Sequence, residues 1–353
     1  MAAKKKSVPD WSFELAGKTF APGERGAVDV ELPGLYTQAE THMPVHVLCG
    51  KKPGPKLLVS AVIHGDELNG LEIVRRLLVS KSIRPLRGVL VAVPVVNVYG
   101  CLNRSRYLPD GRDLNRSFPG SAKGSMASRL AFQFMRDIVS QVDYGIDLHT
   151  AGGQRDNLPH LRSAPEMPET LEMAKAFGAP VVLHADLLDG SLRHAALEQG
   201  IPMLLFEGGA ALSFDELAIR TGVRGIVRVM RHIGMLPGAS KRRAVEPVVV
   251  RRSSWVRAPE SGVFRAFKPL GSVVEAGEQL GAVSNLLGDQ EIPVVASRGG
   301  VVIGTCRLPL VHEGEALFHV GQPDSGQTAD ETLDQFQDEH NLDKDLAGHP
   351  RVF

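Results

Sequence analysis

The sequence contains little cysteine and no long apolar run. Its three cysteines, Cys49, Cys101 and Cys306, are odd in number and widely separated, which argues against a disulfide framework and favours a reducing compartment. No stretch reaches the roughly 18 uncharged apolar residues that a membrane-spanning helix requires. We therefore expect a cytoplasmic protein that does not associate with membranes.

Net charge is absent as well. The chain has 40 lysine and arginine residues against 40 aspartate and glutamate residues, so the composition gives no sign of nucleic-acid binding. A basic run near the start, Lys4-Lys5-Lys6, is short, and no apolar segment follows it. These features predict a solvated, mobile terminal segment and not a signal peptide.

What the sequence does contain is an alternation of strand-like and helix-like segments. With 353 residues the chain is long enough for two domains. Apolar runs of strand length at 57–63, 89–96, 144–148 and 203–206 alternate with helical spacing at 67–79, 125–142 and 223–233. This alternation predicts an α/β/α sandwich with a mixed, largely parallel sheet. We expect this domain to span residues 41–238, after an N-terminal extension at 1–40.

A different pattern begins after a linker at 237–243 that contains glycine and proline. Two runs recur after about 38 positions: 258–263 is echoed by 296–301, and 274–280 is echoed by 311–317. Short strands with glycine turns in two similar units predict a small C-terminal all-β domain at 239–321. Its expected architecture is barrel-sandwich-like and is similar to that of biotinyl and lipoyl carrier domains.

This β domain is not expected to carry a swinging arm. Its turn at 284–289 lacks the lysine that such carriers modify. A lid over the site, or a module for homo-oligomerisation, is the expected role. The polar stretch that follows, 322–353, is predicted to be a disordered tail.

Three residues carry the chemistry most directly: His64, Glu67 and His149. Zinc in catalytic sites takes imidazole nitrogens and a carboxylate oxygen from three protein ligands and keeps one position for water. His64 and His149 each follow an apolar run of strand length, and in largely parallel sheets reactive groups gather at the carboxyl ends of strands. The sequence therefore predicts one zinc ion per chain, bound by these three side chains.

Other motifs follow the His64-Gly-Asp-Glu67 segment in a fixed order. They are Asn97-Val-Tyr-Gly100, Arg106, Asp113-Leu-Asn-Arg-Ser-Phe-Pro-Gly120, Asp147-Leu-His149 and Leu205-Phe-Glu-Gly-Gly209. This ordered set resembles the succinylglutamate desuccinylase/aspartoacylase family, a branch of the zinc carboxypeptidase fold, over roughly residues 40–235. The resemblance implies a zinc-dependent hydrolase of class EC 3.5.1.- that cleaves the amide bond of a small, carboxylate-bearing N-acyl amino acid.

The resemblance also implies the catalytic roles. Glu207 is the expected general base, and it ends an apolar run whose surroundings raise the pKa of a carboxylate towards the working range. A helix cap or a salt bridge is the structural alternative for this residue. Arg106 is expected to stabilise the oxyanion together with the zinc ion, with Arg104 as the competing assignment.

Substrate binding is assigned to two segments. Asn115 and Arg116 resemble the family's clamp for a substrate carboxylate, which a guanidinium group fits well, and Asp113 is expected to orient them. A turn residue and a surface salt bridge are the alternatives for Asn115 and Arg116. In the glycine-containing loop after His149, four polar residues are candidates for contacts with the acyl part, although ordinary loop polarity explains them equally well: Arg155, Asn157, His160 and Arg162.

Two departures from the family's sequence pattern reduce the range of expected substrates. Aspartoacylase-like members carry a tyrosine in the C-terminal domain that helps to hold substrate, and this chain has no tyrosine after Tyr144. The spacer between Arg106 and Asp113 is also longer than in aspartoacylase, so N-acetylaspartate is not the expected substrate. A zinc carboxypeptidase that removes a C-terminal residue such as glutamate from a short peptide would use the same residues. A catalytically silent binding protein is the non-enzymatic alternative.

Overall fold

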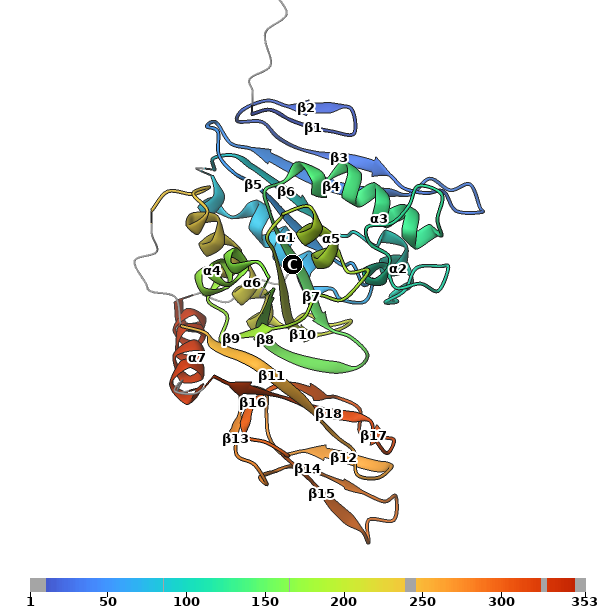
Figure 1. The fold of residues 1–353 in the computed structure, drawn as a ribbon, viewed down its shortest axis with the longest axis vertical. Coiled ribbons are helices and arrows are strands. Elements are labelled where there is room, and N and C mark those ends of the chain that lie inside the picture. The colour runs from blue at the N-terminus through green and yellow to red at the C-terminus, as the bar shows by residue number, and fades with distance from the viewer. Residues whose placement is uncertain (1–10, 85, 165, 239–245, 325–328, 347–353) are drawn as a thin grey trace, which may run out of the picture. The chain divides into compact units, whose positions relative to one another are not determined.

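The computed structural model describes residues 11–84, 86–164, 166–238, 246–324 and 329–346 (Figure 1). The Lys4-Lys5-Lys6 run and most of the linker at 237–243 lie outside these residues. The chain forms two compact units, which we call the first and the second unit. The first comprises Met1–His149, Leu187–Leu205 and Ile226–Lys241, and the second comprises Thr150–Asp186, Phe206–Gly225 and Arg242–Phe353. The domain boundaries expected from the sequence stay predictions.

The first unit holds most of the elements of the N-terminal half. Its strands are β1 (Phe13–Leu15), β2 (Lys18–Phe20), β3 (Arg25–Glu31), β4 (His42–Cys49), β5 (Lys56–Ala61), β6 (Val89–Val93) and most of β7 (Tyr144–Ala151). Its α-helices are α1 (Asn69–Val79), α2 (Val98–Asn103), α3 (Met126–Asp137) and α5 (Leu192–Glu198), and short 3-10 helices lie at Lys81–Ile83, Leu114–Arg116 and Val139–Gln141. Three elements, β7, β10 (Met203–Ala210) and α6 (Glu216–His232), begin in one unit and end in the other.

The sheet of the first unit has the strand order β7-β5-β6-β4-β3. β5 runs parallel to both neighbours, with Leu57 opposite Leu90 of β6 and Tyr144 of β7, whereas β4 is antiparallel to β6 and to β3. The expected α/β fold with a mixed sheet is confirmed. Because β5, β6 and β7 share one direction, the segments that follow them emerge at one edge of the sheet.

Helices cover both faces of this sheet. On one face, α3 buries Leu130 and Phe134, four positions apart on one side of the helix, in the same apolar cluster as Leu58 of β5. On the other face α1 approaches so closely that a Cβ on Gly70 would lie 2.7 Å from the Cβ of Ala61. Alternate residues of β5 therefore face opposite helices, which explains why the strand is mostly apolar.

The second unit contains the remaining elements. They are β8 (Arg155–Ser163), α4 (Pro168–Phe177), β9 (Val181–His184), β11 (Val248–Arg257), β12 (Gly262–Ala266), β13 (Val273–Val274), β14 (Gln279–Ser284), β15 (Glu291–Val295), β16 (Gly300–Cys306), β17 (Leu310–Val311), β18 (Ala316–Pro323) and α7 (Ala329–Leu346). Five strands close into a ring in the order β8-β9-β11-β18-β16, because β16 also pairs with β8.

The expected separate all-β domain is not confirmed. Three of its strands, β11, β16 and β18, complete the ring with β8 and β9, which precede the linker. Closing the ring gives the backbone of β8 and β16 hydrogen-bond partners that an open edge would lack. A second sheet, β15-β14-β12-β17, shares an apolar core with the ring strands through residues such as Phe264, Leu280 and Phe318.

The internal repeat has a structural counterpart. The first copy forms β12, β13 and β14, and the second forms β16, β17 and β18, so each copy has a long strand, a two-residue strand and a long strand. Gly277 and Gly314 occupy equivalent turns with φ of 84° and 79°, a conformation that favours glycine.

The polar C-terminal stretch was wrongly expected to be disordered. It contains α7, whose first part buries Ala329, Leu333 and Phe336. These residues are spaced by four and three positions and therefore lie on one face of the helix. Ala329 and Leu333 join an apolar cluster with Val248 of β11. Acidic residues are interspersed with these few apolar residues, so the composition of the segment did not indicate that one face of a helix is buried.

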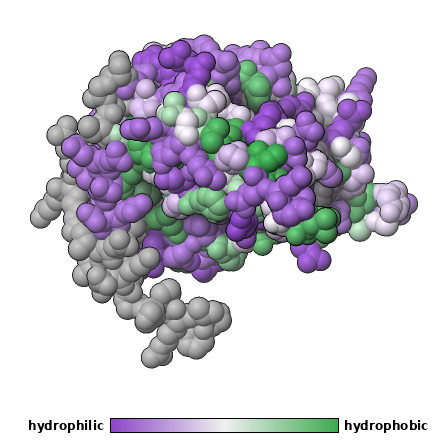
Figure 2. All heavy atoms as spheres, turned by 90° about the horizontal axis from the view of Figure 1, so that it is seen from below, coloured by the Kyte–Doolittle hydropathy of each residue, from purple (hydrophilic) through white to green (hydrophobic). Residues whose placement is uncertain are grey.

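None of the helices in the described residues is both long and apolar enough to cross a membrane. On the face shown in Figure 2, hydrophilic side chains predominate and hydrophobic ones form small, separate patches.

Candidate metal centre and active site

The three predicted metal ligands come together at the carboxyl edge of the first unit's sheet. His64 and Glu67 lie in the turn that follows β5, and His149 lies near the end of β7. One donor atom from each side chain lies within 4.8 Å of the other two, and all three residues are buried. Two imidazoles and a carboxylate in such proximity match the donor set of a catalytic zinc site.

The turn that carries His64 is fixed by its backbone. Val62 has φ of 57°, in the left-handed region that a β-branched residue seldom adopts. Its carbonyl oxygen accepts a hydrogen bond from the N–H of Asn97, and the buried side chain of Asn97 donates to the carbonyl oxygen of Ile63. Gly65 lies so close to Gly100 that a Cβ would sit 1.9 Å from the Gly100 carbonyl carbon. These contacts tie the ligand turn to the segment that follows β6.

A chain of buried polar groups orients His149. Its Nδ1 lies 2.9 Å from Oε2 of Glu67, and its Nε2 lies 2.7 Å from Oδ2 of Asp147. Asp147 in turn accepts a hydrogen bond of 2.8 Å from the hydroxyl of Ser60. A carboxylate that receives the far N–H of a ligand histidine fixes its tautomer and makes the near nitrogen a better donor to metal. Asp147 stands two residues before His149 on one strand, and this same-face spacing was the signal for its role.

His64 has an equivalent arrangement. Its Nδ1 lies 2.7 Å from Oε1 of Glu67, and its Nε2 lies 3.2 Å from Oδ1 of Asp113. Asp113 also receives two hydrogen bonds from the guanidinium of Arg106, at 3.0 and 2.8 Å. Burial tends to raise the pKa of Asp113, but the hydrogen bond to His64 and the charge of Arg106 outweigh it and hold this pKa well below its usual range. The ionised form of Asp113 is therefore favoured, and its carboxylate contacts both His64 and Arg106.

The electrostatics of the three ligands favour a cation between them. Burial tends to raise the pKa of Glu67, but the two imidazoles outweigh burial and hold the pKa well below its usual range. Burial tends to lower the pKa of His64 and His149, but the facing carboxylates outweigh it and raise both pKa values. With neutral imidazoles, the three carboxylates and the guanidinium of Arg106 carry a net charge of −2, which a divalent cation would balance.

Arg106 is placed better for catalysis than Arg104. The Nη1 of Arg106 lies 3.3 Å from Oε1 of Glu67, so its guanidinium reaches the ligand cluster. Its side chain is partly buried, and the carboxylates of Asp113 and Glu67 overcome the effect of burial and raise its pKa. Arg104 is exposed and ends α2 with φ of 52°. Arg106 therefore keeps its charge beside the candidate metal ligands.

Asn115 and Arg116 differ in their surroundings. Asn115 is buried, its Oδ1 accepts a hydrogen bond of 2.9 Å from the N–H of Leu192, and its own N–H donates to Asp113. The Nδ2 group of Asn115 makes no hydrogen bond to the described residues. Arg116 is exposed, and its Nη1 donates to the carbonyl oxygen of Asn115 at 2.7 Å. Asn115 therefore has a free donor for a substrate, while the clamp role of Arg116 stays a prediction.

The predicted base and one predicted substrate residue meet in the second unit. Glu207 lies in β10, and its Oε2 accepts a hydrogen bond of 3.1 Å from Nδ2 of Asn157 in β8. The Nε of Arg162 lies 3.5 Å from Oε1 of Glu207, whose side chain is 13% exposed. The carboxylate of Glu207 is thus oriented by an amide and an arginine.

Arg155 contacts an aromatic stack in the same unit. Its guanidinium carbon lies 4.9 Å from the centre of the Trp255 ring, and the Trp255 ring stacks on that of His319 with centres 4.5 Å apart. Sequence reasoning missed this stack, because Trp255 and His319 belong to strands more than 90 residues beyond Arg155.

Comparison with known proteins agrees with this geometry. The catalytic-domain model of the succinylglutamate desuccinylase/aspartoacylase family matches residues 53–233. An N-alpha-acetyl-L-2,4-diaminobutyric acid deacetylase from Halomonas elongata is 32% identical over 285 residues, which cover 76% of this chain and 82% of the relative. A succinylglutamate desuccinylase/aspartoacylase structure from Rhodobacter sphaeroides has 27% identity and a TM-score of 0.76, and the match covers 85% of this chain and 96% of that one. The product-bound ectoine utilization protein EutE (DoeB) from Ruegeria pomeroyi has 26% identity and a TM-score of 0.76 over 85% of this chain and 97% of its own.

Proposed function

Because the chain belongs to the succinylglutamate desuccinylase/aspartoacylase family, we propose that it is a zinc-dependent deacylase that hydrolyses the amide bond of a small N-acyl amino acid. The observation that carries the proposal is the cluster of His64, Glu67 and His149, whose donor atoms lie within 4.8 Å of one another. Each imidazole has a further carboxylate behind it, as zinc-binding histidines commonly do. We propose one zinc ion per chain.

A zinc ion bound by these residues would acidify a water molecule towards a pKa of about 7 and polarise the substrate carbonyl. The chain must then supply a general base, a positive charge that stabilises the oxyanion, and side chains that bind the substrate. We assign the base to Glu207, whose carboxylate takes a proton from the attacking water and passes it to the leaving amide nitrogen. Its low exposure and its hydrogen bond to Asn157 support this role, since both restrict the carboxylate to one orientation.

Arg106 is proposed to stabilise the oxyanion. Its guanidinium lies within hydrogen-bond distance of Glu67 and is held from the other side by Asp113. A preorganised donor of this kind contributes roughly 3 kcal/mol to the transition state. Asn115 is proposed to bind the substrate carboxylate through its free Nδ2 group, with Arg116 beside it, and Arg155 and Asn157 are proposed to contact the acyl part.

The substrate that we propose is an N-acetylated diamino acid. The relative from Halomonas elongata, which is 32% identical, acts on N-alpha-acetyl-L-2,4-diaminobutyric acid according to its name. We therefore expect kcat/KM to be highest for this compound in a panel that also contains N-succinylglutamate, N-acetylaspartate and a short peptide ending in glutamate. Highest activity on the peptide would instead identify a carboxypeptidase.

Two variants separate an enzyme from a silent binding protein. Glu207→Gln should lose turnover while it keeps zinc and substrate affinity, and Arg106→Ala should lower kcat by about 100- to 1,000-fold. Arg104→Ala is the matched control and should keep wild-type kcat. Full activity of Glu207→Gln would refute the base assignment, and an inactive wild type that binds the substrate would identify a binding protein. Cytoplasmic location and homo-oligomerisation stay proposals that these assays do not address.

A further inference from the structure

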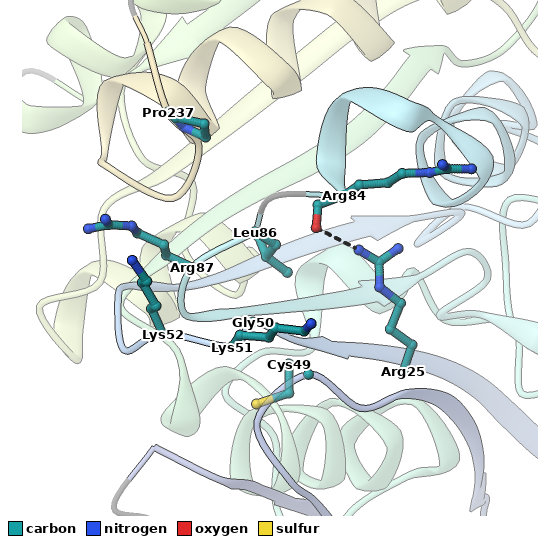
Figure 3. A pocket seen from close by; sticks show the side chains of 10 residues that line it. Arg25, Cys49, Gly50, Lys51, Lys52, Arg84, Leu86, Arg87 and Pro237 are labelled. Carbon is teal, nitrogen blue, oxygen red and sulfur yellow. Dashed lines mark hydrogen bonds between the residues drawn. The ribbon is translucent and has the colours of Figure 1, made fainter.

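A cavity of about 390 Å³ lies in the first unit, and Figure 3 shows the residues that line it. It lies at the edge of the sheet opposite the candidate metal ligands. Lys51 and Lys52 precede β5, and Leu86 and Arg87 precede β6, whereas His64 follows β5. β5 spans six residues, so roughly 17 Å of strand separates the two places. The cavity is therefore distinct from the metal centre.

The lining of the cavity is strongly basic. Five of its ten residues are positively charged and none is acidic: Arg25, Lys51, Lys52, Arg84 and Arg87. Within the described part of the chain, the last four form no ion pair with a carboxylate. A concave surface with one sign of charge attracts counter-ions, and its like charges repel one another until an anion binds.

The backbone around the cavity is rigidly connected. Gly50 packs so closely on the next loop that a Cβ would lie 2.4 Å from the carbonyl oxygen of Leu86. The N–H of Gly50 donates to the carbonyl oxygen of Gly88 at 2.7 Å, and the N–H of Gly88 donates to that of Lys52 at 2.9 Å. These contacts hold the loops before β5 and β6 together, so their cationic side chains are presented on one fixed frame.

Arg25 adds a further connection across the cavity. From β3 its Nη2 donates to the carbonyl oxygens of Ile83 and Arg84 at 3.2 and 3.3 Å, and the bond to Arg84 is drawn in Figure 3. Pro237 and Leu86 supply apolar surface beside the charges. The result is a pocket in which cationic side chains from several segments lie beside a small apolar surface, a combination found in sites for small charged ligands.

We propose that this cavity binds a small organic polyanion that carries at least two phosphate or carboxylate groups. Several cations without carboxylate partners favour a ligand with more than one negative charge, and the volume limits the ligand to a small molecule. Arginine forks bind phosphate and carboxylate in two-point contacts, while the lysines act as point charges. The proposal does not depend on the deacylase activity.

Titration calorimetry of the zinc-loaded protein with pyrophosphate and with citrate tests the proposal. We expect one molecule to bind per chain, with an affinity that falls as salt is added. The variant Lys51→Gln/Lys52→Gln/Arg87→Gln should weaken binding about tenfold or more, and Lys51→Gln alone should weaken it less. Tighter binding of pyrophosphate would assign a phosphorylated ligand, and tighter binding of citrate would assign a polycarboxylate.

Two controls distinguish the cavity from general surface charge and from the metal centre. Lys123→Gln/Arg252→Gln/Arg298→Gln removes the same charge from exposed positions outside the cavity and should leave binding unchanged. His149→Ala should also bind pyrophosphate normally, because it alters only the metal centre. Equal loss of affinity in the two triple variants would overturn the proposal, as would no binding of either anion by the wild type. Sedimentation showing a dimer that the cavity variant dissociates would assign the surface to a second copy of the chain instead.

Discussion

Two pairs of buried histidines, one in each unit, have opposite electrostatics. His64 and His149 in the first unit face Glu67, Asp113 and Asp147, and the carboxylates raise both pKa values despite burial. In the second unit, burial and the charge of Arg162 lower the pKa of His160 to about 3 and that of His319 to about 4. The same residue type at similar burial therefore has a raised pKa beside carboxylates in one unit and a lowered pKa beside arginines in the other. The neighbours decide its chemistry.

The largest expected effect is the loss of metal from the first pair. His149→Ala removes one of the three proposed ligands and leaves Glu67 and Asp147 facing each other without the imidazole between them. We expect the purified variant to lose its zinc, measured by mass spectrometry, and to lose more than about 1,000-fold in kcat. His312→Ala, which removes an exposed histidine, should retain the metal. Full zinc content in His149→Ala would show that this residue is not a ligand.

A smaller effect is expected from the carboxylate behind the ligand. Asp147→Asn keeps the size of the side chain and its contact with Ser60 but removes the charge that holds the His149 N–H. Zinc affinity, measured by competition with a chelator, should fall by about 10- to 100-fold. Glu260→Gln removes the charge of an exposed side chain in the second unit and should leave the zinc affinity unchanged. Unchanged zinc affinity in Asp147→Asn would mean that the charge of Asp147 does not contribute to metal binding by His64 and His149.

The second pair should make folding sensitive to acid. The unfolded chain binds protons at histidines with a pKa near 6.5, whereas folded His160 and His319 bind them only near pH 3 and 4. The unfolded state thus binds more protons between about pH 6.5 and 4, so stability falls as the pH falls through this window. At pH 5 each histidine should destabilise the fold by about 2 kcal/mol relative to pH 7.

Urea unfolding at pH 7 and pH 5 measures this effect. Trp11→Phe leaves Trp255, which stacks on His319, as the fluorescent reporter of the second unit. In the same background, His160→Gln/His319→Gln should show a smaller loss of stability between the two pH values, whatever its stability at pH 7. Equal losses in the two proteins would place the acid sensitivity elsewhere.

The comparison of the two units also shows which features could be predicted from sequence patterns and which could not. The proximity of His64, Glu67 and His149 was predictable because the first two follow β5 and the third lies near the end of β7, and parallel strands bring their carboxyl ends together. Arg106 was placed by motif order, and its preference over Arg104 needed the contacts with Glu67 and Asp113.

Features that depend on strand pairing between distant parts of the chain could not be predicted from the sequence. The contact between β8 and β16 joins Asn157 to Gly304, which are far apart in the chain, and no local pattern specifies that pairing. Pairing of β11 with β9, and not composition, places the C-terminal strands in one sheet with β8 and β9, and the contact of β16 with β8 then closes the ring. The stack of Arg155, Trp255 and His319 depends on the same closure and was therefore out of reach of motif analysis.

The smallest expected effect concerns this stack. Arg155 helps to lower the pKa of His319, after burial and Arg162, which contribute more. Arg155→Gln should therefore raise the pKa of His319 modestly towards its ordinary value while burial and Arg162 still hold it low. NMR titration of labelled histidines measures the shift directly, and Arg298→Gln, an exposed change of the same type, should give none. If His319 titrated near its ordinary pKa in the wild type, burial and arginines would not control the second pair, and the contrast between the two units would fail.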